Sequence, residues 1–252
     1  MKAMILAAGR GTRLKPLTDH CPKALISIAE KPLLLHVLEK LKDAGVRDVI
    51  INVHHHAEMI IDYLQNNNQT GLNIEISKED KLLDTGGGLK KAAWFFAKDD
   101  KPFYLHNVDI LSGIDLREMM QIHIRQKNIA TLAVNRRKTS RYLLFDADNS
   151  LVGWQSLSPR ATEIARESEG KREAYAFLGV HVLSPEIFTY LPDENNFSII
   201  RAYLTITGKF NSIRAYTCQD NFWFDVGRKE NLKQAGKFYK NLNPLRKRKN
   251  NE

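Results

Sequence analysis

Long apolar runs and paired cysteines are both missing from this sequence of 252 residues. No stretch approaches the roughly 20 apolar residues that a membrane-spanning helix needs. The apolar run Met4–Ala8 is too short for the core of a signal peptide, and arginines follow it at once. We therefore expect a cytoplasmic protein with no membrane contact. The two cysteines, Cys21 and Cys218, lie far apart, which excludes a disulfide framework and a CxxC zinc site and predicts free thiols.

The two standard glycine loops for nucleotides are absent as well. The sequence has no GxxxxGKS or GxxxxGKT motif, which excludes a P-loop. Gly9 and Gly11 are not followed by the third glycine of a dinucleotide-binding turn, and the second predicted strand ends without an acidic residue. The three consecutive histidines, 54–56, match no metal-binding spacing. We expect them to form a loop that caps the next helix.

Positive charge, in contrast, is abundant. The sequence has 38 Lys and Arg against 29 Asp and Glu, a net charge of +9. Residues 237–252 hold six basic residues against one Glu, so they account for +5 of this excess. We expect residues 239–252 to be a solvated basic C-terminal tail. We predict no nucleic-acid partner, although this tail keeps that alternative open.

Strand-like and helix-like segments alternate through the first 134 residues. Apolar and β-branched runs predict strands over 3–8, 46–53, 72–77, 103–106 and 131–134. Amphipathic spacing predicts helices over 32–44, 57–65, 88–97 and 116–126. This order predicts an α/β fold with a mostly parallel sheet covered by helices on both faces. Ligands of such sheets bind at the carboxyl ends of the strands.

The pattern changes after residue 135. Strands are predicted over 142–145, 151–154, 174–183 and 213–217, with a hairpin-like DADNS turn between the first two. Helices are predicted over 185–190, 198–207 and 228–239. We therefore expect a single domain over residues 1–238, in which the part after residue 135 adds antiparallel strands and forms an acceptor pocket.

The first strand leads into a cationic loop marked by glycines. Gly9 and Gly11 allow the backbone to approach an anion closely, and successive amides there can form an anion-binding nest. Arg13 and Lys23 can neutralise phosphate charge, the arginine as a planar fork and the lysine as a point charge. On these residues alone, a plain surface turn remains the alternative.

The segment LAAGRGTRLKPLTDHCPKAL, residues 6–25, resembles the signature AAGxGTRLxPLT and PKxL of the sugar-phosphate nucleotidyltransferases, which make nucleoside-diphosphate sugars. The segments SKEDKLLDTGGGLKKA, PFYLHNVDI, FLGVHVLSPEIF and FWFDVGRKENL resemble further parts of that family. The resemblance extends from residue 1 to about residue 238. It implies a Rossmann-like, GT-A-like three-layer fold with a mixed, mostly parallel central sheet. It also implies a nucleotide-binding part over 1–135 and a sugar-phosphate-binding part over 136–238.

The resemblance implies roles for the residues that match the family motifs. Arg13, Lys23 and Asp109 are the expected catalytic residues, and Asp109 and Asp225 the expected ligands of Mg²⁺. A nucleobase that lies flat against the backbone needs residues without side chains, which fits the glycines at 86 and 87. The expected nucleotide-binding residues are Ala7, Ala8, Gly9, Arg10, Gly11, Thr12, Thr85, Gly86, Gly87 and Asn107.

On the acceptor side, the resemblance assigns Asn135 and Gly179 to the sugar. Within the family, the pattern is closest to the N-acetylmuramate 1-phosphate uridylyltransferases and to mannose-1-phosphate guanylyltransferase-like proteins. The stretch NRRKTSRYLLFD, residues 135–146, departs from the former subfamily. It brings three arginines, at 136, 137 and 141, to the acceptor side of the cleft.

The family activity implied is transfer of a nucleotidyl group from UTP, GTP, CTP or dTTP to a sugar 1-phosphate, by Mg²⁺-assisted in-line attack on the α-phosphorus with release of pyrophosphate. The chain is expected to be a monomer or a homodimer. Two departures, Val108 for the usual glycine and Arg228 for the common threonine, support the alternative of a nucleotide-sugar sensor without activity. Because valine does not adopt the glycine dihedrals cheaply, the backbone at Val108 is expected to differ from that of the family.

Overall fold

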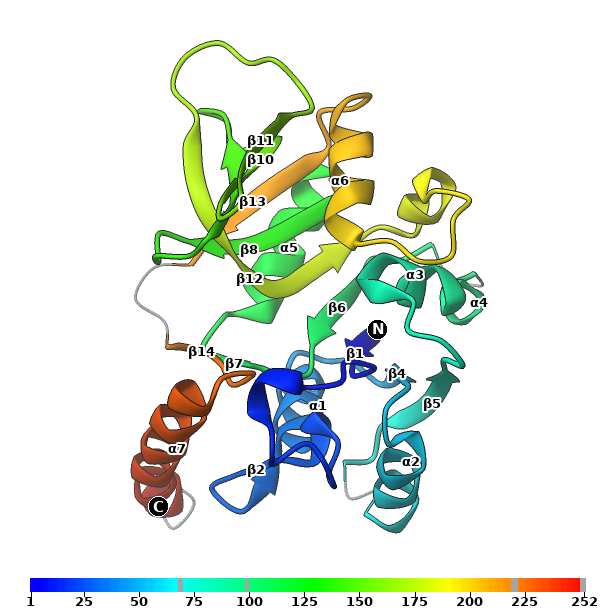
Figure 1. Cartoon of the computed structure of the whole chain (residues 1–252), viewed down its shortest axis with the longest axis vertical. Helices are drawn as coiled ribbons and strands as arrows, with labels where there is room; N and C mark the ends of the chain where they lie inside the picture. The colour runs from blue at the N-terminus through cyan, green and yellow to red at the C-terminus, as the bar shows by residue number, and fades with distance from the viewer. Residues whose placement is uncertain (68–69, 98–99, 219–221, 250–252) are drawn as a thin grey trace.

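The computed structural model of the chain describes residues 1–67, 70–97, 100–218 and 222–249. A ten-stranded sheet forms its centre (Figure 1). The strands of this sheet are β1 (Lys2–Leu6), β4 (Asp48–Val53), β5 (Asn73–Lys78), β6 (Phe103–Asn107), β8 (Ala130–Asn135), β9 (Arg141–Phe145), β10 (Leu151–Leu157), β11 (Arg160–Ile164), β12 (Glu173–Leu183) and β13 (Ile213–Thr217). The main path has the order β11-β10-β9-β12-β6-β1-β4-β5, and β8 joins it at β12 and pairs with β13.

Helices cover both faces of this sheet, and alternation along the strands explains why. Ala3 and Ile5 of β1 belong to one buried cluster, whereas Met4 and Leu6 belong to another on the opposite face. The helices of the first cluster are α1 (Leu33–Asp43), α2 (Ala57–Asn66) and α5 (Leu116–Gln126). Those of the second are α3 (Asp84–Lys91), α4 (Ala93–Phe96) and α6 (Ile199–Thr207). The predicted three-layer arrangement is confirmed.

The sheet is mixed, as predicted: most of its parallel pairs lie in the first half of the chain, and one more joins β13 to β8. β1 lies parallel between β4 and β6, and β5 lies parallel to β4. The long strand β12 is antiparallel to β6, β8 and β9, so the parallel order ends at β6. β12 also joins the strands before and after residue 135 into one sheet.

Two short ribbons, neither of them predicted, lie beside the main sheet. β7 (Ile110–Ser112) pairs antiparallel with β14 (Trp223–Asp225), and β2 (Ser27–Ile28) pairs with β3 (Lys31–Pro32). The last helix, α7 (Lys229–Lys249), packs on both ribbons and continues beyond the expected end at residue 239. Three 3₁₀ helices complete the described elements: η1 (Thr12–Leu14), η2 (Lys23–Leu25) and η3 (Pro185–Tyr190).

Most predicted elements are present, with three further differences. The helix expected over 88–97 begins at Asp84 and divides at Ala92 into α3 and α4. Strand β11, which pairs with β10, was not predicted. His56 does occupy the N-cap position of α2, but its side chain makes no capping hydrogen bond.

Two expectations about the whole chain can also be compared with the described residues. Cys21 and Cys218 are free thiols, as predicted. Within the described ranges, no helix has the length and apolarity needed to cross a bilayer.

Candidate functional site

The glycine-marked loop after β1 folds back on itself at Gly11. Gly11 has φ +63°, and a methyl group added there would lie 2.8 Å from Cγ2 of Thr18. The buried Thr18 donates its hydroxyl hydrogen to the Gly11 carbonyl at 2.9 Å. This close packing requires glycine, and it returns the chain toward β1. Lys23, at the start of η2, thereby lies next to Gly9.

Lys23 and Asp109 form the central ion pair of the site. The Lys23 Nζ lies 2.6 Å from Oδ2 of Asp109, and the two side chains are only 14% and 11% exposed. Asp109 lies in the turn two residues after β6, at the carboxyl end of the parallel strands. The predicted lysine and aspartate, 86 residues apart, are therefore in direct contact.

The β7–β14 ribbon brings Asp225 to the same place. Asp225 is paired with Ile110, the residue after Asp109, and the Val226 N–H donates to the Asp109 carbonyl at 2.9 Å. On the other side, Arg13 NH1 lies 3.8 Å from Oδ2 of Asp225. The four charged residues predicted for the site thus form one cluster.

Gly227, which the sequence did not single out, occupies the centre of this cluster. A methyl group added there would lie 2.8 Å from Asp225 Oδ1, 3.1 Å from Asp109 Oδ2 and 3.2 Å from Arg13 NH2. Its N–H donates to Asp225 Oδ1 at 3.0 Å and orients that carboxylate. The only earlier signal was its place in the FWFDVGRKENL segment.

The donor set at Gly227 fits a magnesium ion. Oxygens of Asp109 and Asp225 face a single point above Gly227 that a side chain would fill. Mg²⁺ commonly takes one or two protein carboxylates and completes its shell with substrate phosphates and water. No cluster of three or more His, Cys, Asp or Glu suited to a metal occurs in the described part of the chain. Two carboxylates alone would leave the remaining ligands of such an ion to water or a bound phosphate.

Val108 does not disturb this arrangement. It is buried, does not adopt a positive φ, and donates its N–H to the Leu6 carbonyl at 3.1 Å. The backbone here continues the β6–β1 pairing, so a valine is accommodated without strain.

A cavity of about 350 Å³ lies beside the ion pair. Four of its polar or charged lining residues were predicted for the nucleotide or for catalysis: Lys23, Thr85, Asn107 and Asp109. A fifth, Asp84, is the neighbour of Thr85. The lining residues are Leu6, Ala8, Gly9, Lys23, Asn52, Leu82, Asp84, Thr85, Asn107, Asp109 and Asn196. Ala7 lies next to the cavity and is buried, whereas Arg10 and Thr12 are exposed.

A buried pair that the sequence analysis missed, Asn52 and Glu79, ties the loops around this cavity together. The Ala7 N–H donates to Asn52 Oδ1 at 2.8 Å, and Asn52 Nδ2 donates to Glu79 Oε1 at 2.7 Å. The other oxygen of Glu79 accepts the Leu83 N–H at 3.1 Å. Glu79 is only 2% exposed, so its carboxylate depends on these bonds. The pair joins the β1 loop to the start of α3.

Gly86 and Gly87 pack against the segment before α6. Both N–H groups donate to the Phe197 carbonyl, at 2.9 and 3.2 Å. An added methyl group would lie 2.3 Å from the Phe197 ring at Gly86 and 2.0 Å from the Asn195 carbonyl oxygen at Gly87. Neither glycine lines the cavity, whereas Thr85 does. Helix packing thus requires that these side chains be missing, which is a reason in addition to the predicted contact with the nucleobase.

Gly179, predicted to bind the sugar, and Asn107, predicted to bind the nucleotide, lie next to each other. Gly179 has φ +75° within an irregular stretch of β12, and a methyl group there would lie 2.8 Å from Asn107 Nδ2. Asn135, at the end of β8, accepts the N–H of Arg137 at 3.2 Å. Gly179 also lies close to β7, since the same methyl group would lie 2.8 Å from Cγ1 of Ile110.

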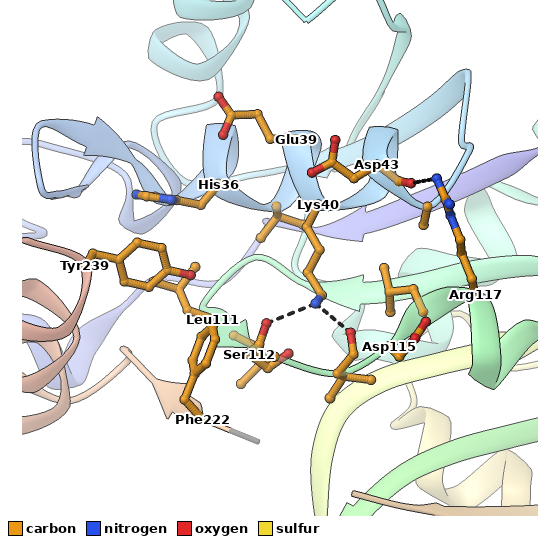
Figure 2. A pocket seen from close by; sticks show the side chains of 16 residues that line it. His36, Glu39, Lys40, Asp43, Leu111, Ser112, Asp115, Arg117, Phe222 and Tyr239 are labelled. Atoms are coloured by element: carbon orange, nitrogen blue, oxygen red, sulfur yellow. Dashed lines mark hydrogen bonds between the residues drawn. The ribbon is translucent and has the colours of Figure 1, made fainter. Parts of the chain in front are cut away.

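Lys40 of α1 contacts the β7–β14 ribbon at β7. Its Nζ lies in a second cavity of about 330 Å³ and donates to the carbonyls of Ser112 and Ile114 at 2.9 and 2.7 Å (Figure 2). Ser112 ends β7, whose partner strand carries Asp225. Burial is the main cause that lowers the pKa of Lys40 to about 8, and Asp115 opposes it.

Replacing Lys40 by methionine is expected to change how stability depends on pH. Between about pH 8 and the ordinary lysine pKa of about 10.4, the unfolded state retains this proton while folded Lys40 releases it. The free energy of unfolding of the wild type therefore rises with pH in this window relative to Lys40→Met. Denaturant unfolding at pH 7.5 and 10 measures the difference. Lys42→Met, an exposed position of the same helix, is the control. A difference between wild type and Lys40→Met that is constant with pH would contradict the expectation.

Comparisons with known proteins agree with this geometry. A family model described as "Nucleotidyl transferase" matches residues 2–241. A mannose-1-phosphate guanyltransferase of Gibberella zeae is 32% identical over 229 residues, which cover 90% of this chain and 61% of that protein. The mannose-1-phosphate guanyltransferase of Saccharomyces cerevisiae is 30% identical over 250 residues, covering 98% and 66%. This chain thus spans less than two thirds of the length of these relatives.

Solved structures share the fold. A putative glucose-1-phosphate thymidylyltransferase from Bacillus anthracis superimposes with a TM-score of 0.78 at 19% identity, covering 94% of each chain. A UDP-glucose pyrophosphorylase bound to UDP-glucose gives a TM-score of 0.74 at 19% identity, covering 95% of this chain and 98% of that one. The predicted Rossmann-like, GT-A-like fold is confirmed.

Proposed function

Since the chain belongs to the nucleotidyl transferase family, we propose that it is an enzyme that transfers a nucleotidyl group from a nucleoside triphosphate to a sugar 1-phosphate. The observation that carries this proposal is the cluster around Gly227. Two carboxylates and two cations from distant parts of the chain converge there, beside a cavity at the carboxyl ends of the parallel strands. Such a cluster suits two phosphate substrates that meet at one point.

The reaction needs positioning and charge neutralisation rather than a protein nucleophile. The loop 7–13 would surround the triphosphate with its backbone amides. Lys23 would contact the reacting phosphates, either by breaking its ion pair with Asp109 or while keeping it. Arg13 would neutralise the departing pyrophosphate. Asp109 and Asp225 would hold Mg²⁺. When bound, this ion supplies positive charge to the phosphate oxygens of both substrates.

The candidate substrates come from the names of the relatives and from the four nucleoside triphosphates among which the sequence does not decide. The names of the relatives point to a guanylyl donor and mannose 1-phosphate, so GTP with mannose 1-phosphate is the first pair to test. UTP, CTP and dTTP remain candidate donors. We further propose a cytoplasmic monomer or homodimer in which residues 1–135 bind the nucleotide and residues 136–238 the sugar phosphate.

A matrix of four nucleoside triphosphates against a panel of sugar 1-phosphates tests this function, with pyrophosphate as the readout. We expect Mg²⁺-dependent release with at least one pair and none without a sugar 1-phosphate. Nucleotide binding without pyrophosphate from any pair would overturn the proposal in favour of a nucleotide-sugar sensor. A binding affinity for nucleic acid that falls steeply with salt and is lost on deletion of residues 240–252 would instead support the nucleic-acid alternative.

A further inference from the structure

Arg137 lies where the acceptor side of the molecule meets the β7–β14 ribbon. Its guanidinium carbon is 4.2 Å from the centre of the Trp223 ring, which places it over the aromatic face. One terminal nitrogen donates to the Phe177 carbonyl at 3.2 Å, and the other to the Lys138 carbonyl at 3.5 Å. Trp223 precedes Asp225 by two residues on β14, so both side chains lie on the same side of that strand. The guanidinium is thus held beside the strand that ends in Asp225.

Within the described ranges, the charge of Arg137 has no carboxylate partner. Two neighbouring arginines do have one: Arg136 pairs with Glu173 at 3.0 Å and Arg201 with Glu194 at 2.9 Å. No ion pair involves Arg137 among the residues that the structure describes, and its buried Nε has no hydrogen-bond partner there. A partly buried cation with an unsatisfied donor is costly unless an anion completes its bonds.

The pKa of Arg137 reflects both its burial and the charges around it. Burial lowers the pKa of Arg137, whereas the Asp225 carboxylate and the Tyr142 hydroxyl oppose that effect. Arg137 also lines a cavity of about 590 Å³ between β9–β12 and the start of α6. Aromatic side chains of that cavity, Tyr142, Trp154 and Phe177, offer apolar faces of the kind that stack on sugar rings. Arg137 therefore belongs both to the cavity wall and to the surroundings of Asp225.

We propose that Arg137 binds the phosphate of the acceptor sugar 1-phosphate and holds it next to Asp225, with the sugar in the cavity of about 590 Å³. This inference rests on the proposed function. An oxygen of that phosphate forms the new bond to the α-phosphorus, while the bond between the α-phosphorus and its bridging oxygen to the β-phosphorus breaks and its electron pair leaves with pyrophosphate. The planar guanidinium can bind two oxygens of the attacking phosphate and leave a third free to react.

The test separates acceptor binding from nucleotide binding. Arg137→Met is expected to raise the KM for the sugar 1-phosphate about a hundredfold, because two charge-assisted hydrogen bonds are lost. The KM for the nucleoside triphosphate is expected to stay within about twofold, since Arg137 does not line the cavity beside Lys23. Arg137→Lys keeps the positive charge but loses the planar, forked set of donors. We expect its KM for the sugar 1-phosphate to lie between those of the wild type and Arg137→Met. Arg125→Met, at an exposed position of α5 that does not line the cavity of about 590 Å³, is the matched control and should leave both KM values unchanged.

A second readout does not depend on turnover. Intrinsic tryptophan fluorescence, to which Trp223 and Trp154 contribute at the proposed site, should change when mannose 1-phosphate is titrated, but not with mannose. The affinity measured in this way should weaken at least tenfold in Arg137→Met. Nucleotide binding by the variant shows that it is folded. Unchanged acceptor affinity in Arg137→Met, or no response of the wild type to any sugar 1-phosphate, would overturn the inference. Absence of turnover by a wild type that still shows this Arg137-dependent binding would overturn the proposed function alone.

Discussion

Asp225→Asn and Asp109→Asn are each expected to lower the rate of Mg²⁺-dependent pyrophosphate release by about a thousandfold. This is the size of effect expected when a preorganised electrostatic group is lost. Each substitution keeps the shape of the side chain and removes one of the two negative charges that face Gly227. A site with a single carboxylate holds Mg²⁺ more weakly and orients the phosphates less well. Initial rates over a range of Mg²⁺ concentrations measure the effect, and excess Mg²⁺ should restore only part of the activity.

The two variants should differ in one respect. Asp109 accepts a 2.6 Å hydrogen bond from the largely buried Lys23, so Asp109→Asn also leaves that cation without its partner and should lower the Tm. Asp225 is 25% exposed and lies 3.8 Å from Arg13, so Asp225→Asn should fold with an almost unchanged Tm. Asp62→Asn, an exposed position of α2, is the control for both. Turnover within tenfold of wild type in either variant would contradict the assignment of the metal ligands.

Alanine at Gly87 is expected to lower the free energy of unfolding by about 3 kcal/mol, which corresponds to a Tm roughly 10 °C lower for a chain of this length. The added methyl group would lie 2.0 Å from the Asn195 carbonyl oxygen and 3.0 Å from Cβ of Leu83. Both contacts are too short, and the first is to backbone, so α3 and the segment before α6 must separate. Thermal unfolding followed by circular dichroism measures the loss.

Gly236→Ala is the matched control. Gly236 lies in α7 with no heavy atom within 4 Å of an added methyl group. Alanine favours a helix over glycine by up to about 1 kcal/mol, so this variant should equal or exceed the wild type in stability. Equal Tm values for the two alanine variants would show that the contact at Asn195 relaxes freely.

The secondary structure could largely be predicted because its signals are local. Residues 116–126 are helical as expected, since Leu116, Met119, Met120 and His123 recur on one buried side. The strands over 48–53 and 103–107 are short apolar runs that are buried on both faces. The three-residue strands β7 and β14 could not be predicted, because their pairing joins positions about 110 residues apart in sequence and neither has a local pattern.

The residues of the candidate site likewise divide into those with a local sequence signal, which were predicted, and those without one, which were missed. The chemistry-bearing residues Arg13, Lys23, Asp109 and Asp225 were found because each belongs to a segment with a family signature. The network of Asn52 and Glu79 was missed, since an Asn at a strand end and a Glu in a polar loop look like surface residues until burial is known. Gly86 and Gly87 were singled out for the nucleobase, and the structure adds a packing contact between α3 and the segment before α6 that the sequence does not show.

The sequence by itself determined the alternation of elements, the family and the types of charged group available for phosphate chemistry, because these depend on composition and short-range pattern. Only the tertiary structure decided which groups meet: Lys23 with Asp109, Arg13 with Asp225, and Arg137 with the ring of Trp223. The physical reason is that a contact between charges depends on distance and burial in space. Those are set by sheet order and by the β7–β14 ribbon, and neither is encoded in any single segment.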